Sequence, residues 1–206
     1  MSDQYSEKEN RIMDRKCKCN KCLYHQYLSN AKGHLKVVLH HKKEVMKGCF
    51  QVGLYWQGIV HDLSKFSPAE FMGGIRYFQG TRSPNARERE LFGYSRTWMH
   101  HKGRNKHHFE YWTDASDDKK HCLEGKKMPP RYLAEMVMDR IAASKTYKGD
   151  AYTNRTPLEY LMKSSDWETM NPETYEELKK ILTILADHGE QSAFHYVRRL
   201  LKRNSY

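Results

Sequence analysis

The chain has 206 residues, 38% hydrophobic and 30% charged, which fits one folded domain with a modest core, with or without a small appendage. Mean hydropathy is −0.92, and no apolar run approaches the roughly 18–20 residues that span a bilayer, which excludes a membrane-spanning protein. The net charge of +11 favours phosphate-bearing partners, yet no RNP motif, zinc knuckle or glycine-rich phosphate loop supports nucleic-acid binding as the main role.

The N-terminal extension, residues 1–28, is polar and rich in cysteine. It lacks the apolar stretch of a signal peptide, so we expect a cytoplasmic protein whose five cysteines are reduced thiols or metal ligands. Cys17, Cys19, Cys22 and His25 supply three thiols and one imidazole, which can close a tetrahedral structural zinc site. The alternative is a disordered basic tail with free thiols, because a CxC start is less usual than CxxC.

The rest of the chain predicts helices. Apolar residues recur at helical spacing from His34 to Val45, and a second helix is expected over residues 49–63. Ser67-Pro68-Ala69-Glu70 has the spacing of a capping box and begins a third helix, whereas residues 79–89 are typical of a loop. A short helix should cover residues 94–101.

The second half continues this pattern. After an irregular stretch to residue 112 and an exposed loop over 114–128, Pro129-Pro130 opens a helix that ends near Tyr147, before Gly149. Cap-then-proline pairs at Thr156-Pro157 and Asn171-Pro172 start two more helices. No segment alternates with period two long enough to indicate a strand. The fold class expected is all-α, a compact helical bundle.

Histidine and aspartate residues at intervals along these helices form the main functional signal. His41, His61-Asp62 and Asp139 lie on three expected helices, whose antiparallel packing could bring the four side chains together. Asp139 lies in a mostly apolar helix, where a buried carboxylate would be costly unless a cation offsets its charge. Imidazole and carboxylate ligands suit Mn, Fe, Ni, Co or Zn, so the sequence predicts a metal site.

Two histidine pairs, His100-His101 and His107-His108, add ligands for a second ion. With one histidine from each pair, represented by His101 and His108, the set becomes four histidines and two aspartates, enough for two metals that share an aspartate. The choice within each pair stays open. His188 and His195 are expected to be ordinary surface or core residues.

These residues also carry a resemblance. His41, HDLSKF at residues 61–66 and Asp139 resemble the HD-domain superfamily of metal-dependent phosphohydrolases. The phrases HDLSKFSPAEF, TWMHHKGRNKHHFEYW and EMVMDRIAASKTYKG are similar to an uncharacterised family of small bacterial and viral HD-like proteins, over about residues 30–165. The resemblance implies an HD-like helical bundle with His41, His61, Asp62 and Asp139 as ligands. The interval from His41 to His61 is short for the superfamily, which keeps His34 and His40 as alternatives to His41.

On this basis we expect three parts: the extension 1–28, an HD-like metal-binding domain over 29–165, and a C-terminal helical segment over 166–206 packed on that domain. Asp62 and Lys65 are the candidate catalytic residues, and Asn105 and Lys145 are candidates for binding substrate. One or two ions would activate water for the hydrolysis of a small phosphorylated substrate, a nucleotide or a related ester. The alternatives are a di-iron oxygenase with the same ligands and a non-catalytic metal- or nucleic-acid-binding protein.

Overall fold

The computed structural model describes residues 20–117 and 122–206. The chain is mostly helical, with 74% helix and 3% strand, which confirms the all-α fold class. None of the helices in the described part is long and apolar enough to cross a membrane. The α-helices within these residues are α2 (Asn20–Gln51), α3 (Tyr55–Val60), α4 (Pro68–Arg76), α5 (Pro84–Phe92), α6 (Arg96–Lys102), α7 (Pro130–Lys148), α8 (Thr156–Lys163) and α9 (Pro172–Arg203).

Short elements join these helices. They are the 3-10 turns η1 (Leu63–Phe66), η2 (Phe109–Trp112), η3 (Gly149–Ala151) and η4 (Asp166–Glu168), and the strands β1 (Thr113–Ala115) and β2 (Leu123–Gly125). The strands pair antiparallel with Thr113 opposite Gly125, inside the segment expected to be a loop. The chain divides into two compact units. Unit 1 contains the residues up to Val38 and Lys65–His100, and unit 2 contains Leu39–Ser64 and His101–Tyr206.

Unit 1 is built on α4, α5 and the first part of α2. The predicted start of α4 is confirmed: Pro68 is its first residue, and the Ser67 hydroxyl accepts a hydrogen bond from the Glu70 amide at 3.4 Å. His34 is buried against Phe71 and Phe78, and a Cβ on Gly74 would lie 2.1 Å from its Nε2, so this contact requires glycine. Helix α4 packs against α5.

The loop predicted over residues 79–89 is wrong, because α5 begins at Pro84. Its sequence, PNARERELF, has few apolar residues, and its place in the unit depends on buried Glu88 instead. That carboxylate accepts hydrogen bonds from the Ser95 hydroxyl at 2.6 Å and the Thr97 amide at 3.2 Å. Gly93 then ends the helix with φ +81°, a left-handed conformation that glycine adopts without strain.

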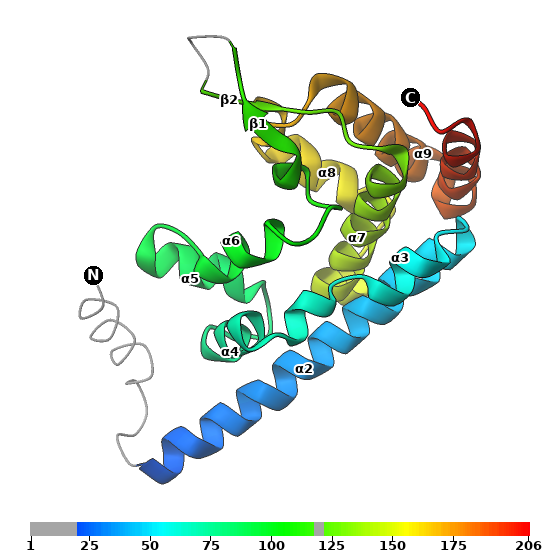
Figure 1. Ribbon diagram of the computed structural model, residues 1–206. Helices are drawn as coiled ribbons and strands as arrows, with labels where there is room; N and C mark the ends of the chain where they lie inside the picture. The colour runs from blue at the N-terminus through cyan, green and yellow to red at the C-terminus, as the bar shows by residue number, and fades with distance from the viewer. Residues whose placement is uncertain (1–19, 118–121) are drawn as a thin grey trace. The chain divides into compact units, whose positions relative to one another are not determined.

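Unit 2 has the larger apolar core. Helices α7, α8 and α9 pack against one another (Figure 1), and α7 buries an unbroken run from Leu133 to Met138. The prediction that this helix opens at the proline pair and stops at Gly149 is confirmed. The two later helices also begin as predicted, at Thr156 and Pro172.

The prediction of one continuous helix over residues 49–63 is wrong, because two helices share this segment. Helix α2 runs through to Gln51, the chain turns at Gly53 with φ +86°, and α3 covers only Tyr55–Val60. The helix expected over 34–45 is confirmed as the middle of α2, which starts much earlier, at Asn20. The break matters because α3 ends directly before His61-Asp62.

Candidate metal centre

The His61-Asp62 pair lies in a tight turn after α3. The His61 amide donates to the Gln57 carbonyl at 2.8 Å, and Asp62 follows with φ +55°, a left-handed backbone that aspartate tolerates better than most residues. Lys42, on α2, donates from Nζ to the carbonyls of Ile59 at 2.7 Å and His61 at 2.8 Å. The two hydrogen bonds from Lys42 therefore stabilise the turn, a role that the sequence did not predict for this lysine.

A first cluster forms around one oxygen of Asp62. Asp62 Oδ2 lies 3.3 Å from His61 Nε2 and 3.7 Å from His41 Nε2, and Asp139 Oδ1 lies 3.0 Å from His41 Nε2 and 3.6 Å from His61 Nε2. Helix α2 contributes His41, α7 contributes Asp139, and the turn after α3 contributes the other two. One ligand atom from each residue lies within 4.8 Å of the others, so these four side chains could hold one metal ion.

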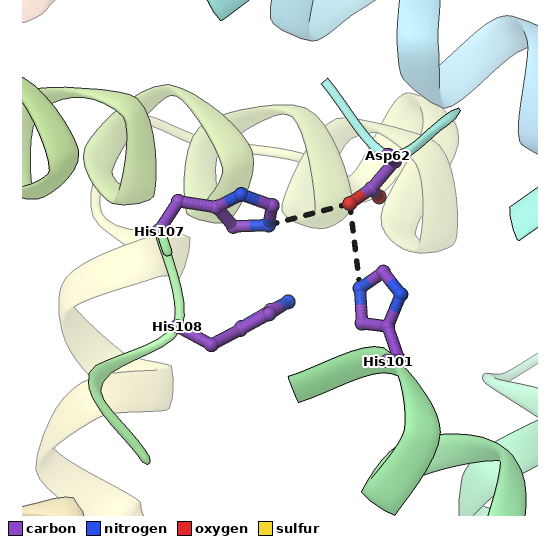
Figure 2. Close-up of side chains that lie close together, drawn as sticks. All are labelled: Asp62, His101, His107 and His108. Atoms are coloured by element: carbon purple, nitrogen blue, oxygen red, sulfur yellow. Dashed lines mark ion pairs between the residues drawn. The ribbon is translucent and has the colours of Figure 1, made fainter. Parts of the chain in front are cut away.

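A second cluster forms around the other oxygen of Asp62. Oδ1 lies 3.3 Å from His101 Nε2 and 3.3 Å from His107 Nε2. His101 comes from α6, and His107 and His108 come from the segment between α6 and η2. Figure 2 shows the three rings gathered around the Asp62 carboxylate. One ligand atom from each of Asp62, His101, His107 and His108 also lies within 4.8 Å of the others, so this set could hold a second ion.

Glu135 contacts one histidine of each cluster. Its Oε1 lies 2.9 Å from His61 Nδ1 and 3.1 Å from His107 Nδ1, so one carboxylate holds the outer nitrogens of two histidines. The Nε2 atoms of both rings are buried and, within the described residues, make no well-directed hydrogen bond. Buried polar atoms without such bonds are costly, and a cation between these nitrogens and the nearby carboxylates removes that cost. The donor set therefore fits a metal ion.

His101 is held in a similar way on its outer side. The Ser64 hydroxyl lies 3.3 Å from His101 Nδ1, and the Asn105 amide nitrogen lies 3.1 Å from the same atom and 2.8 Å from Ser64 Oγ. The Nε2 side of the ring consequently faces Asp62. Asn105, predicted to bind substrate, contacts His101, one of the predicted metal ligands.

The charges in the clusters are strongly coupled. Burial by itself lowers the pKa of His61, but Asp62, Asp139 and Glu135 outweigh burial and hold that pKa well above its usual value. Burial raises the pKa of Asp139. Hydrogen bonds to His41 and His61 outweigh burial and hold that pKa well below its usual value. For His108, burial and then the neighbouring histidines lower the pKa well below its usual value.

The family follows from a comparison of sequences. Residues 30–184 match a family described as "Family of unknown function (DUF5662)". The chain belongs to this family. A search of curated proteins and a search of solved structures each found no match.

The structure brings together all six of the predicted metal ligands, in the two clusters that share Asp62. Their role in binding stays a prediction. Of the alternatives, His107 joins the second cluster beside His108, whereas His100 pairs with Glu70 at 2.7 Å in unit 1. His34 is buried among aromatic rings in unit 1, and His40 is exposed on α2.

The two lysines predicted to be functional, and the cysteines within the described residues, do not belong to either cluster. Lys145 Nζ pairs with Glu190 at 2.5 Å, and Lys65 lies in η1 and belongs to unit 1. Of the predicted zinc ligands, Cys17 and Cys19 lie outside the described residues. No cluster that could hold a metal in the described part of the chain contains a cysteine.

Glu135 is the functional candidate that sequence reasoning missed most clearly. It lies four residues before Asp139 on α7, one helical turn away, and residues at this spacing share a face of the helix. A second carboxylate at that position in an apolar helix was the available signal.

Proposed function

We propose that this chain is a metal-dependent hydrolase of the HD type that cleaves a phosphate ester with two divalent cations. The observation that carries the proposal is the placement of Asp62. One of its oxygens lies 3.3 Å from His61 and 3.7 Å from His41, and the other lies 3.3 Å from both His101 and His107. Asp139 and His108 complete the two clusters, so one carboxylate stands between two sets of predicted ligands. Two-metal hydrolases hold their ions about 3.5–4 Å apart, a separation that a shared carboxylate can bridge.

The balance of charge favours an anionic substrate. Two divalent ions would bring four positive charges, whereas the carboxylates of Asp62, Asp139 and Glu135 bring three negative charges, leaving an excess of one. A phosphate ester offsets that excess in a site where Asp62 and Glu135 are 2% and 5% exposed. The overall charge of +11 adds attraction for the same substrates at longer range.

The protein's own side chains have separable tasks in this proposal. Bound cations would activate a water molecule and offset charge on the phosphoryl oxygens. Asp62 joins the two ligand sets, Glu135 and Lys42 orient ligands, and the buried setting keeps bulk water away. A phosphate at Lys145 would compete with Glu190.

A di-iron oxygenase is the second candidate, favoured by the composition of the second cluster. Three imidazoles and one carboxylate make a nitrogen-rich set that also suits iron. The two functions predict different metals and different co-substrates.

The test combines metal analysis with a substrate panel. The full-length chain is loaded separately with Mn, Co, Ni, Zn or Fe and assayed on bis(p-nitrophenyl) phosphate and on nucleoside mono-, di- and triphosphates. We expect two ions per chain and metal-dependent hydrolysis that is lost in His41→Ala and in His101→Ala. His188→Ala, an exposed position on α9, is the matched control and should behave as wild type.

Other outcomes identify the alternatives. Two irons with oxygen consumption and no hydrolysis would replace the hydrolase with an oxygenase. Absence of turnover across the panel together with salt-sensitive binding of nucleic acid would indicate a non-catalytic binding protein. Absence of metal binding would overturn the proposal at its base.

A further inference from the structure

Glu135 connects two ligands that belong to different clusters. His61 lies beside Asp62 Oδ2 and Asp139 in the first cluster, whereas His107 lies beside Asp62 Oδ1 in the second. The two rings are 4.3 Å apart between centroids, and the same Glu135 oxygen faces the Nδ1 atom of each. The Glu135 residue is 5% exposed, so water competes little for these contacts.

We propose that Glu135 is a positioning residue shared by the two metal subsites, so that a single side chain sets the affinity of both ions. This inference rests on the proposed two-metal function. A ligand histidine that donates Nδ1–H to a carboxylate is fixed in its tautomer and its ring orientation, with Nε2 directed at the metal. Glu135 meets that requirement for one histidine of each subsite.

The two histidines differ in how much they need this support. His61 follows α3 directly and lies in the turn that Lys42 holds. His107 lies in the irregular segment between α6 and η2, where no helical hydrogen-bond ladder fixes it. Glu135 lies within the longest buried run of α7, so it links this loop ligand to a rigid helix.

A direct role as a metal ligand is the competing explanation. His61, His107 and Glu135 also lie close enough together to hold an ion. Their nearest atoms are Glu135 Oε1 and the two Nδ1 atoms, at 2.9 Å and 3.1 Å. That arrangement supplies only three protein ligands. A neutral imidazole that binds an ion through Nδ1 carries its proton on Nε2, so neither ring could then bind one of the two proposed ions through the Nε2 atom that faces Asp62 at 3.3 Å.

The experiment compares two substitutions of Glu135, one that removes the charge of its side chain and one that shortens the side chain. Glu135→Gln keeps the length of the side chain and an oxygen that accepts hydrogen bonds, but removes the charge. Glu135→Asp keeps the charge and shortens the side chain, so its carboxylate no longer reaches both Nδ1 atoms. Binding of Mn²⁺ to the metal-free full-length chain is measured by calorimetry, and electron paramagnetic resonance reports the spin coupling of neighbouring ions.

Positioning predicts that Glu135→Asp weakens both binding steps by about 10–100-fold, the usual cost of losing an outer-shell partner. The coupled two-ion signal should disappear at metal ratios that saturate wild type. Glu135→Gln should stay closer to wild type in both steps and keep the coupled signal. Asp139→Asn and His108→Ala serve as references that weaken mainly the first and mainly the second ion.

Glu88→Gln and Glu88→Asp are matched controls, because Glu88 is also buried and also accepts two hydrogen bonds, in unit 1. They should leave both binding steps unchanged. Weakening of one ion alone by Glu135→Asp would overturn the shared role, as would a larger loss in Glu135→Gln than in Glu135→Asp. If wild type binds a third ion and both Glu135 variants lose it, Glu135 would be a metal ligand instead of a positioning residue. If wild type binds no metal, the proposed function fails first.

Discussion

The two units bury charged side chains in opposite ways. In unit 1, Glu88 is satisfied by the Ser95 hydroxyl and the Thr97 amide, and Glu70 faces His100 at 2.7 Å. Both carboxylates therefore face protein groups that can donate hydrogen bonds. In unit 2, the outer nitrogens of His61 and His107 are bound to Glu135, yet their inner nitrogens point into a space shared by carboxylates. In unit 1 each buried carboxylate faces protein donors, whereas in unit 2 several imidazoles and carboxylates face one another across one small space, which is the arrangement that could hold a metal ion.

The largest effect should come from removing the carboxylate that both clusters share. Asp62→Gly accepts the φ of +55° without strain and deletes both oxygens. We expect loss of both ions and of hydrolysis, with helical content unchanged by circular dichroism. Metal analysis by mass spectrometry checks the stoichiometry. Retention of two ions in this variant would contradict the bridging role of Asp62.

Removal of metal should destabilise unit 2 selectively. A ligand at 100 times its Kd stabilises the folded state by about 2.7 kcal/mol, and chelation reverses that gain. Hydrogen exchange should therefore speed up in α7 after treatment with a chelator and stay unchanged in α4 and α5. Equal effects in both units, or none in α7, would break the distinction between them.

Unit 1 should respond to loss of its own buried carboxylate. Glu88→Ala leaves the Ser95 hydroxyl and the Thr97 amide without their acceptor, at a cost of about 1–3 kcal/mol in the free energy of unfolding. Chemical denaturation measures that cost, and metal stoichiometry should remain that of wild type. A change in metal binding would show that the two ways of burying charge are not independent.

The smallest effect concerns His34. Burial, and then the charge of Lys65, lower its pKa from 6.5 to about 4, so the folded state binds this proton less readily than the unfolded state. The stability that this neutral ring contributes is present above pH 6.5 and is lost as pH falls toward 4. Between pH 7 and 6 the loss should be below about 1 kcal/mol.

A nuclear magnetic resonance titration of the His34 ring gives the most direct check, with an expected midpoint near pH 4. Lys65→Met should raise the midpoint. A midpoint of 6.5 in the wild-type chain would show that the ring is not buried as described.

Helix boundaries were predictable where caps and apolar periodicity agree, as at the proline pair that opens α7 and at Gly149, which ends it. Helix α5 was missed because its order depends on Glu88 contacts made across a turn, which hydrophobic patterning does not reveal. The break before α3 depends on a positive φ at Gly53, and the sequence alone does not distinguish that glycine from one inside a helix.

The candidate site shows the same limits. The His61-Asp62 pair stood out because an imidazole and a carboxylate are adjacent, and Asp139 stood out because a charged residue is unusual in an apolar helix. The choice between His107 and His108 depends on an irregular backbone without periodicity, and both rings join the second cluster. Lys42 acts through backbone carbonyls, for which a lysine on a helix gives no signal in the sequence.

The central claim is that Asp62 holds two cations, one on each carboxylate oxygen. Crystals of the metal-loaded chain, measured at the absorption edge of the bound metal, test it directly. The account predicts two anomalous peaks about 3.5–4 Å apart, one beside Asp139 and one beside His101, with Asp62 between them. A single peak, or two peaks that Asp62 does not touch, would contradict it.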